Sequence, residues 1–594
     1  METKTASPKS ILSEVSFDRT WSHIEHITEK IPSRLAGSPS SRKMVEYSHD
    51  VFQKAGLESK IHEFRGLVSF PESAAVKLLS PESRDIEGFT LGHSASTEGI
   101  EGELVYVGSG AEKEYEGKDV REKITLSELS YSPARHEKAL VAWQRGSVAQ
   151  IMMNWGDETN QAIPFGSMKP AWGNPTPETL VNEMPNLPCV GIARTEGLHL
   201  KELCTRGPVR VWLRSKAENG WKPLSMNSAE FNAAGERQFL LLGGHTDSWF
   251  GPQATDNAAG NACIMELARV FCQHRDLLRR GIVAGLWMGH ETGTMISSSR
   301  FADVNWDRLR RSCVAYMQID QPGIIGGTVW NQRSTDDIQT YALQTLREVA
   351  GDIPVRAARM SKIGDASFFG VGLPCMAGGM SFTDEELKRT ALANLGWWHH
   401  SIHNTIDKLD KKLLAFSLKV YASWVWGLLT EAILPCEYQP LATRFVDRLG
   451  ELAKIHVPDI NMAGAVERAK EFQQQARWLD EQAQAWKRRP QTDADSEKAA
   501  GVLNRVMIEL SRTLVPIAST VVGPYGQDRY GHAWQTQMIP SLVPYGNLAK
   551  YGRDSEEYQT WWVAMVRARN RVADALEHAT NILQLAEKEV GSHR

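Results

Sequence analysis

Cysteine is scarce in this sequence, and the net charge is close to zero. The seven cysteines are odd in number and several lie inside apolar runs, so we interpret them as reduced core residues and not as a disulfide framework. The formal net charge of -4 gives no reason to expect nucleic acid or an acidic membrane as a partner.

Long apolar stretches and repeats are missing as well. No run of apolar residues has the length of a membrane span, and the first residues, Met-Glu-Thr-Lys-Thr-Ala-Ser-Pro, contain no apolar core of a signal peptide. We therefore expect a cytoplasmic protein that does not bind a membrane. The hydrophobic content of 42% and charged content of 23% are typical of a globular protein, and 594 residues are too many for one core.

The hydrophobic pattern divides the chain into regions. Apolar residues spaced three and four apart predict helices at 18–31 and 40–55, and short alternating runs predict a separate β-rich domain at 67–225. From residue 239 onward, continuous apolar strands alternate with helical segments, which indicates an α/β domain with a mainly parallel sheet. Apolar stripes after residue 437 predict a helical domain at 438–594.

Five acidic or histidine residues stand in separate short motifs, and three of them follow predicted strands directly. In chain order they are His245, Asp256, Glu291, Asp320 and His400. Ligand sites of open α/β sheets lie at the carboxyl ends of the strands. Taken singly, each residue has a simple structural explanation, such as a helix cap for Asp256 or a turn for Asp320. Together, two imidazoles and three carboxylates can hold two divalent cations.

These motifs resemble the dizinc aminopeptidase and glutamate carboxypeptidase family, whose closer branch includes the transferrin receptor. The resemblance rests on Gly-Gly-His-Thr-Asp-Ser, Thr-Asp-Asn-Ala-Ala-Gly, His-Glu-Thr-Gly, Gln-Ile-Asp and His-His-Ser-Ile-His-Asn-Thr, in this order. It implies a metallopeptidase-like catalytic domain formed by 1–66 and 226–437. It also implies that 67–225 is an inserted protease-associated domain and that 438–594 is a helical dimerisation domain, which would make the protein a homodimer.

The same resemblance implies roles for the five residues. Asp256 would bridge two zinc ions, His245 and Asp320 would complete one site, and Glu291 and His400 the other. Asp247 would hydrogen-bond His245 and fix its tautomer. The donor types themselves also permit manganese or cobalt, or a single occupied site.

The chain departs from this family at the catalytic base. Where the family has two adjacent glutamates, this chain has His290 followed by Glu291. General-base catalysis is worth about 10²–10⁴ in rate. Two nearby cations would favour the neutral imidazole, which can accept a proton from the attacking water and pass it on. We therefore predict that His290 replaces the glutamate as proton shuttle, without its negative charge.

Other departures indicate a less acidic and more apolar pocket. Asn404 and Ala366 stand where the family has a carboxylate and a histidine. We predict that a substrate pocket is formed by Trp249, Phe368, Phe369, Trp398 and His399, with Trp330 as a further aromatic candidate. Such walls favour a small, flat or aromatic substrate, or a short peptide-like one.

The sequence thus predicts a dinuclear metallohydrolase with amidohydrolase activity on a small, non-standard substrate. Two alternatives stay open at this point. One is a metal-dependent lyase or other non-hydrolytic enzyme on the same scaffold, in which His290 moves a proton. The other is a non-catalytic binding protein of the receptor type, although the chain retains all five of the proposed ligands.

Overall fold

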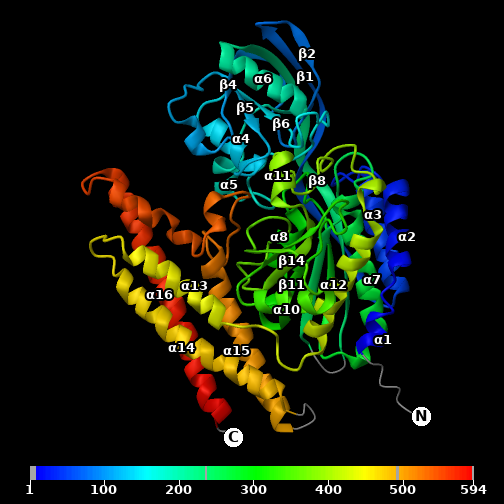
Figure 1. Cartoon of the computed structure of the whole chain (residues 1–594), viewed down its shortest axis with the longest axis vertical. Coiled ribbons are helices and arrows are strands. Elements are labelled where there is room, and N and C mark those ends of the chain that lie inside the picture. Colours follow the sequence, from blue (N-terminus) through cyan, green and yellow to red (C-terminus); the bar gives the residue numbers. More distant parts are fainter. Residues whose placement is uncertain (1–7, 234–236, 490–493, 592–594) are drawn as a thin grey trace.

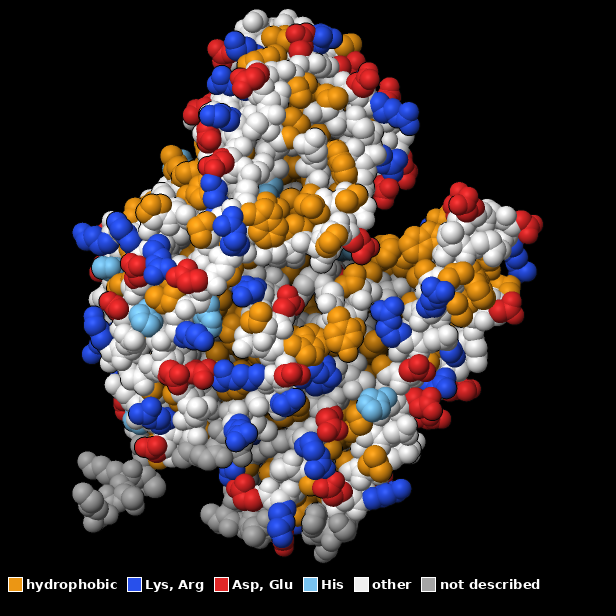
Figure 2. Space-filling model, turned by 180° about the vertical axis from the view of Figure 1, so that it is seen from behind, with side chains coloured by type: hydrophobic (Ala, Val, Ile, Leu, Met, Phe, Trp, Pro, Cys, Tyr) orange, Lys and Arg blue, Asp and Glu red, His pale blue; other side chains and the backbone are white. Residues whose placement is uncertain are grey.

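The computed structural model describes residues 8–233, 237–489 and 494–591. Figure 1 shows three regions: a central α/β region, an apical region above it, and a group of long helices beside it. Lysine and arginine lie among aspartate and glutamate over the face seen in Figure 2, as expected from 67 basic and 71 acidic residues.

The central region is built on a sheet whose inner strands are parallel. β9 pairs in parallel with β10 on one side and with β11 on the other, and β11 pairs in parallel with β14. The strand order is β13-β12-β14-β11-β9-β10-β8. The strands of this part are β9 (Phe239–His245), β10 (Gly281–Trp287), β11 (Cys313–Gln318), β12 (Val329–Ser334), β13 (Val355–Arg359) and β14 (Cys375–Ser381).

Both faces of this sheet are buried, which explains the continuous apolar strands. Along β9, Leu240 and Leu242 belong to the core on one face, whereas Phe239 and Leu241 belong to the core on the other. The covering helices are α2 (Phe17–Lys30), α3 (Pro39–Lys54), α7 (Ala259–Gln273), α8 (Ile296–Val304), α9 (Trp306–Ser312), α10 (Gln339–Ala350) and α12 (Lys411–Thr430), and a short α11 (Asp384–Arg389) lies near the apical region. The predicted helices at 18–31 and 40–55 are thereby confirmed to within one residue at each end.

Two long strands connect the central region to the apical region. β1 (Glu58–Ser80) and β8 (Arg210–Phe231) pair antiparallel from Glu58↔Glu230 to Ser80↔Arg210. The predicted boundaries at residues 67 and 225 therefore fall inside strands. The turn formers in this stretch do not end β1, because a shift of register between Pro71 and Ser73 accommodates the proline.

The apical region also contains helices and parallel strands. β4, β5, β6 and β7 pair in parallel with one another in that order. Its remaining elements are β2 (Arg84–Ile86), β3 (Gly88–Thr90), β4 (Thr97–Tyr106), β5 (Ile124–Glu128), α4 (Arg135–Gln144), β6 (Ala149–Met153), α5 (Pro177–Asn182), β7 (Cys189–Ile192) and α6 (Arg194–Arg206).

Four long helices pack together at the C-terminal end of the chain. They are α13 (Gln439–Ala453), α14 (Met462–Lys487), α15 (Ala494–Ser519) and α16 (Glu556–Gly591), and α1 (Pro8–Leu12) lies apart from them near the N-terminus. Phe472 and Leu479 of α14 and Leu576 and Leu583 of α16 share one apolar core, as expected from the stripes in the sequence.

Two expectations about apolar residues have different outcomes. All seven cysteines are free, and six of them are buried, so the interpretation as reduced core residues is confirmed. The statement that no stretch has the length of a membrane span is wrong for α12, which is long and apolar enough by length and composition. However, 56% of its apolar window is buried inside the protein, and helices of a protein core pass the same test.

One buried arginine of α15 joins the helices to the central region. The Arg512 guanidinium donates to the carbonyl oxygens of Arg310 (3.0 Å), Gly372 (2.6 Å), Leu309 (3.0 Å) and Cys313. Its side chain is almost fully buried, and burial lowers the pKa of Arg512 to about 10. The hydrogen bonds must therefore offset the cost of removing this cation from water.

We predict that Arg512→Met destabilises the fold by about 3 kcal/mol or more, because a charged hydrogen-bonding group is lost and four buried carbonyls lose their donor. The shift of the unfolding transition in calorimetry measures this. Arg468→Met is the control, since its ion pair with Glu577 is exposed and worth about 1 kcal/mol at most. Equal melting temperatures for the two variants would contradict the prediction.

Candidate metal centre

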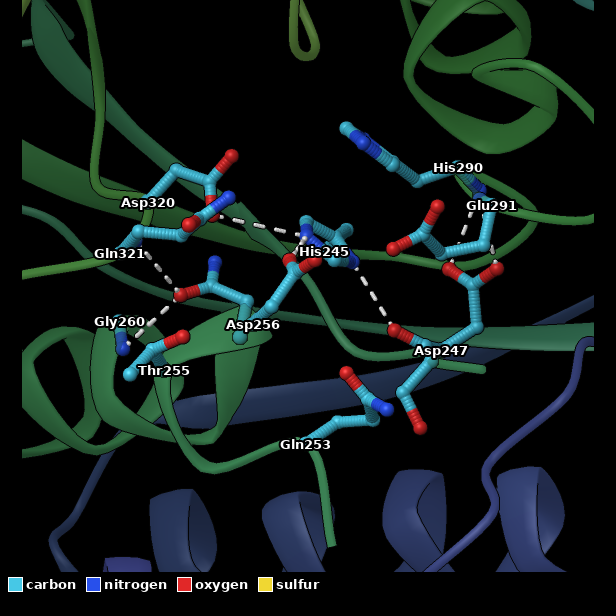
Figure 3. A network of polar contacts seen from close by, with 12 residues as sticks. His245, Asp247, Gln253, Thr255, Asp256, Gly260, His290, Glu291, Asp320 and Gln321 are labelled. Atoms are coloured by element: carbon cyan, nitrogen blue, oxygen red, sulfur yellow. Dashed lines mark hydrogen bonds and ion pairs between the residues drawn. The ribbon is translucent and has the colours of Figure 1, made fainter. Parts of the chain in front are cut away.

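The five predicted ligands come together at the carboxyl edge of the central sheet. Figure 3 shows four of them, namely His245, Asp256, Glu291 and Asp320. His245 is the last residue of β9, Glu291 follows β10, and Asp320 follows β11. Asp256 lies in the irregular turn Ala254–Ala258 before α7, and His400 lies in the loop before α12 with a left-handed φ of 54°. The sheet therefore places three of the five, and loops bring the other two to them.

Short distances connect these side chains. His245 Nε2 lies 2.9 Å from Asp256 Oδ1 and 3.5 Å from Asp320 Oδ1. His400 Nε2 lies 3.2 Å from Asp256 Oδ2 and 3.1 Å from Glu291 Oε1. Asp256 thus stands between a group with His245 and Asp320 and a group with His400 and Glu291.

The donor atoms fit divalent cations. Asp256 Oδ2, Glu291 Oε1 and Asp320 Oδ1 are buried and have no hydrogen-bond partner among the described residues. Donor atoms of His245, Asp256 and Asp320 lie within 4.8 Å of one another, and so do those of Asp256, His399 and His400. Buried carboxylate oxygens are costly when they are unpaired, and metal coordination removes that cost.

The electrostatics of the site are consistent with this fit. Burial lowers the pKa of His245, but the carboxylates of Asp320 and Asp256 raise it more, so that it lies well above its usual value. For His400, burial again lowers the pKa and Glu291 raises it, with a net upward shift. A field that favours a proton on these nitrogens also favours a metal cation at them.

Asp247 orients the loop of His290 and Glu291, and its contact with His245 differs in detail from the one expected. Its carboxylate accepts the backbone N–H groups of His290 and Glu291, both at 3.0 Å. Burial raises the pKa of Asp247 to about 6. The atom that lies 2.9 Å from His245 Nδ1 is the Asp247 backbone carbonyl, which can accept a hydrogen bond from that nitrogen and leave Nε2 facing the other ligands.

His290 lies in the site, with its ring stacked on that of His245 at a centroid distance of 3.8 Å. Its Nδ1 is 2.9 Å from the buried carboxylate of Asp365. Burial and His245 lower the pKa of His290, whereas Asp365 and Glu291 raise it, and the result is about 9. The carboxylates act against the neutral form expected from the sequence, and bound cations would act in its favour.

The four aromatic side chains that were predicted to form the pocket do not line the cavity. Phe368 and Phe369 are fully buried in the core, and Trp398 packs against Ile324 and Phe382. Trp249 is also buried, and its indole Nε1 donates to Glu291 Oε2 at 2.7 Å, so it orients a candidate ligand. Large apolar side chains occur both in protein cores and in pocket walls, so the sequence alone did not show which of the two these residues form.

His399 and Trp330, the other candidates for the pocket, have different outcomes. His399 lines the cavity, and its Nδ1 lies 3.3 Å from Asp256 Oδ2. Trp330 is buried against Trp424 and Tyr421 of α12. The structure therefore places His399 beside the candidate ligands, and Trp330 inside the core.

The cavity beside the candidate ligands has a volume of about 450 Å³ and is formed by all three regions. The apical region contributes Arg135 and Trp155, the central region Asn331 and Arg333, and the segment after α15 contributes Tyr530. The sequence did not single out these residues, because no local pattern marks residues that distant segments bring together. The lining combines apolar side chains, such as Met295 and Met360, with the two charged guanidinium groups, which the sequence did not predict.

Arg135 connects the apical region to the metal-type ligands. Its guanidinium donates to the carbonyl oxygens of Ser167 (3.2 Å) and Phe165 (3.3 Å) and lies 2.9 Å from His400 Nδ1. The Phe165 N–H donates to the backbone carbonyl of His400 at 2.6 Å. The loop that carries His400 is thus held by the apical region.

We predict that Asp247→Asn weakens zinc binding by about 10–100-fold, because an amide supplies one acceptor where two backbone N–H groups need one each. Titration against a chromophoric chelator measures the affinity. Asp307→Asn, which removes the same charge from an exposed carboxylate, serves as the control. Equal zinc affinity of the two variants would show that the His290–Glu291 backbone needs no such support.

Comparison with known proteins supports the arrangement. Residues 228–425 match peptidase family M28. The chain is 23% identical over 521 residues to the probable glutamate carboxypeptidase AMP1 of Arabidopsis thaliana, covering 72% of this chain and 71% of that protein. It is 23% identical over 413 residues to aminopeptidase YwaD of Bacillus subtilis, covering 66% of this chain and 81% of that protein.

A solved structure has the same fold. The zinc aminopeptidase BSAP of Bacillus subtilis aligns with a TM-score of 0.53 and 20% identity, over 70% of this chain and 96% of that one. The fold, the convergence of the candidate ligands and the matched residues agree with one another. The protein is therefore a metallohydrolase whose residues 228–425 match peptidase family M28.

Proposed function

We propose that the chain is a dinuclear metal-dependent hydrolase that cleaves an amide or peptide-like bond of a small substrate. The observation that carries this proposal is the convergence of five donor side chains from separate motifs, with buried oxygens that have no hydrogen-bond partner among the described residues. Asp256 would be shared between two ions, with His245 and Asp320 on one side and Glu291 and His400 on the other. Zinc fits these donors, and manganese or cobalt would fit them as well.

Bound cations would lower the pKa of water and polarise the carbonyl of the substrate. In this proposal the chain itself moves the proton. His290 would accept it at Nε2 from the attacking water and then donate it to the leaving nitrogen as the C–N bond breaks. His290 lines the cavity, whereas its Nδ1 is occupied by Asp365, and both observations support this assignment.

The cavity favours a substrate that carries an anionic group. Arg333 projects from β12 and is partly buried, and no carboxylate among the described residues pairs with it. Burial lowers its pKa, as expected for a cation without an acidic partner. Arg135 adds a second guanidinium to the same lining. Because an unpaired cation is costly in a cavity, we propose that a carboxylate of the substrate pairs with it.

Several expectations from the sequence remain proposals about the whole protein. We propose a catalytic domain at 1–66 and 226–437, a protease-associated domain at 67–225 and a helical dimerisation domain at 438–594. We also propose a cytoplasmic homodimer without nucleic-acid or membrane partners. Light scattering of the purified protein at several concentrations tests the dimer, and a monomeric mass at all of them would contradict it.

We expect zinc-loaded protein to hydrolyse at least one compound in a panel of N-acyl amino acids, aminoacyl nitroanilides and esters. Chelator should abolish turnover, and His290→Ala should lower kcat by about 10²–10⁴-fold because the proton shuttle is lost. His274→Ala, at a partly exposed histidine that is paired with Glu14, is the control. Water labelled with heavy oxygen should place the label in the acid product, whereas an unlabelled product would indicate elimination. No turnover of any member by zinc-loaded protein would contradict hydrolysis.

A second prediction concerns the charge of the substrate. Arg333→Gln should raise KM about tenfold or more for an anionic substrate, because a charged hydrogen bond is worth about 1.5–3 kcal/mol, and should change it little for the neutral amide analogue. Arg356→Gln on the neighbouring strand β13 is the matched control, since Arg356 pairs with the exposed Asp384. An equal effect of Arg333→Gln on both substrates would argue against recognition of the anion.

A further inference from the structure

We propose that Asp365 is a positioning residue for His290: it fixes the tautomer of the imidazole and places a negative charge directly behind it. This inference rests on the proposed function, in which His290 is the proton shuttle. The Asp365 carboxylate is almost fully buried, and its Oδ2 lies 2.9 Å from His290 Nδ1. Among the described residues no lysine or arginine forms an ion pair with it.

The carboxylate of Asp365 is itself held in place. Its Oδ1 accepts a hydrogen bond from Ser298 Oγ at 2.7 Å, and Ser298 Oγ lies 2.9 Å from Ser367 Oγ. Ser367 Oγ in turn accepts from the indole Nε1 of Trp172, which belongs to the apical region, at 2.8 Å. A buried chain of hydrogen bonds therefore extends from the apical region to the imidazole of His290.

The backbone before Asp365 also has a special conformation. Gly364 has a φ of +56°, and a Cβ at this position would lie 2.0 Å from Gln318 Nε2. A side chain would be strained there by conformation and by contact. Glycine thus allows the chain to turn so that Asp365 reaches His290 beside the end of β11.

Three contacts restrain His290 together. Its backbone N–H donates to Asp247, its ring stacks on His245 with an interplanar angle of 14°, and its Nδ1 meets Asp365. A neutral imidazole that donates Nδ1–H to a carboxylate has its lone pair on Nε2. The nitrogen that is free to act on a substrate is then the one not held by Asp365.

The Asp365 carboxylate would supply, behind the imidazole, the negative charge that a histidine base lacks in comparison with a glutamate. As the oxygen of water bonds to the substrate carbon, the carbonyl π bond would open and its electron pair would move to the carbonyl oxygen. Nε2 would take one proton of the water, which forms an imidazolium whose Nδ1–H still donates to Asp365. When the C–N bond breaks, the C=O bond would re-form, the Nε2 proton would pass to the leaving nitrogen, and the imidazole would be neutral again. Asp365 stabilises the imidazolium in between, without taking the proton itself.

A competing role for His290 is that of a metal ligand. Donor atoms of His245, His290 and Glu291 lie within 4.8 Å of one another, so Nε2 could bind a cation instead of a proton. The two roles differ in what a variant loses. Loss of a ligand lowers the metal content, whereas loss of an orienting carboxylate changes kcat and the tautomer and leaves the metal content intact.

The first test compares Asp365→Asn with the wild type on the substrate found with the panel. We expect kcat to fall about 10²–10⁴-fold with little change in KM or zinc content, because an asparagine amide can donate to Nδ1 and leave the proton on Nε2. Asp303→Asn, which removes the same charge from an exposed carboxylate of α8 that forms no contact with His290 among the described residues, is the control. Loss of zinc in Asp365→Asn, or unchanged kcat, would overturn the proposal.

The second test replaces His290, the partner of Asp365, by glutamate. In a His290→Glu background, Asp365→Asn should leave kcat unchanged or raise it, since a carboxylate base gains nothing from a second carboxylate behind it. A merely structural role of Asp365 would reduce kcat equally in both backgrounds. Full activity of His290→Ala would instead refute the proposed function, whereas an inactive His290→Ala with a fully active Asp365→Asn would refute the positioning role alone.

The third test needs no substrate. In zinc-loaded protein labelled with ¹⁵N at histidine, comparison with His290→Glu identifies the ring signals of His290. We expect an unprotonated Nε2 in the wild type and a protonated Nε2 in Asp365→Asn. The same tautomer in both proteins would overturn the proposal.

Discussion

Burying several carboxylates beside one another is the constraint on which the site depends. Asp256, Glu291 and Asp320 would repel one another, and each would lose its hydration. Hydrogen-bond donors of neighbouring residues offset part of this repulsion and of the lost hydration. Trp249 donates to Glu291, the imidazoles face Asp256, and Arg34 lies buried nearby with hydrogen bonds to Thr246, Pro252 and Gln253. The buried carboxylate oxygens that have no hydrogen-bond partner in the described part of the chain mark the place where cations would complete the arrangement.

The same constraint explains why three regions are needed. The sheet edge supplies ligands, but it does not enclose a substrate. The ring of Tyr530, from the segment after α15, packs in a tilted arrangement against that of His136 of α4, with a centroid distance of 4.0 Å. The preceding Arg529 forms a two-point ion pair with Glu137, with 2.8 Å for both contacts. These contacts bring the apical and helical parts together over the cavity, where exclusion of water strengthens every electrostatic interaction.

The sequence was informative where local pattern decides the structure. The buried strands β9, β10 and β11 and the ligands at their ends follow from apolar runs and adjacent polar residues, and the helices α2 and α3 follow from apolar spacing. The cavity lining could not be predicted in this way, because Arg135 and Tyr530 reach the site only through tertiary packing. Aromatic residues such as Phe368 and Phe369 can form either a pocket wall or a core. Only the tertiary packing shows that they lie in the core.

If His290 is the base, as proposed, the negative charge lies in a different place relative to the reacting atoms than it would with a carboxylate base. A glutamate would place its charge directly at the attacking water. In this chain the nearest carboxylate behind the base is that of Asp365, on the far side of the imidazole ring. A charge at that distance still stabilises a protonated base in a site of low dielectric constant, but it repels an anionic substrate or leaving group less strongly. With two guanidinium groups in the lining, and with an imidazole that bound cations would hold neutral before reaction, the proposed mechanism would suit an anionic substrate better than a carboxylate base would.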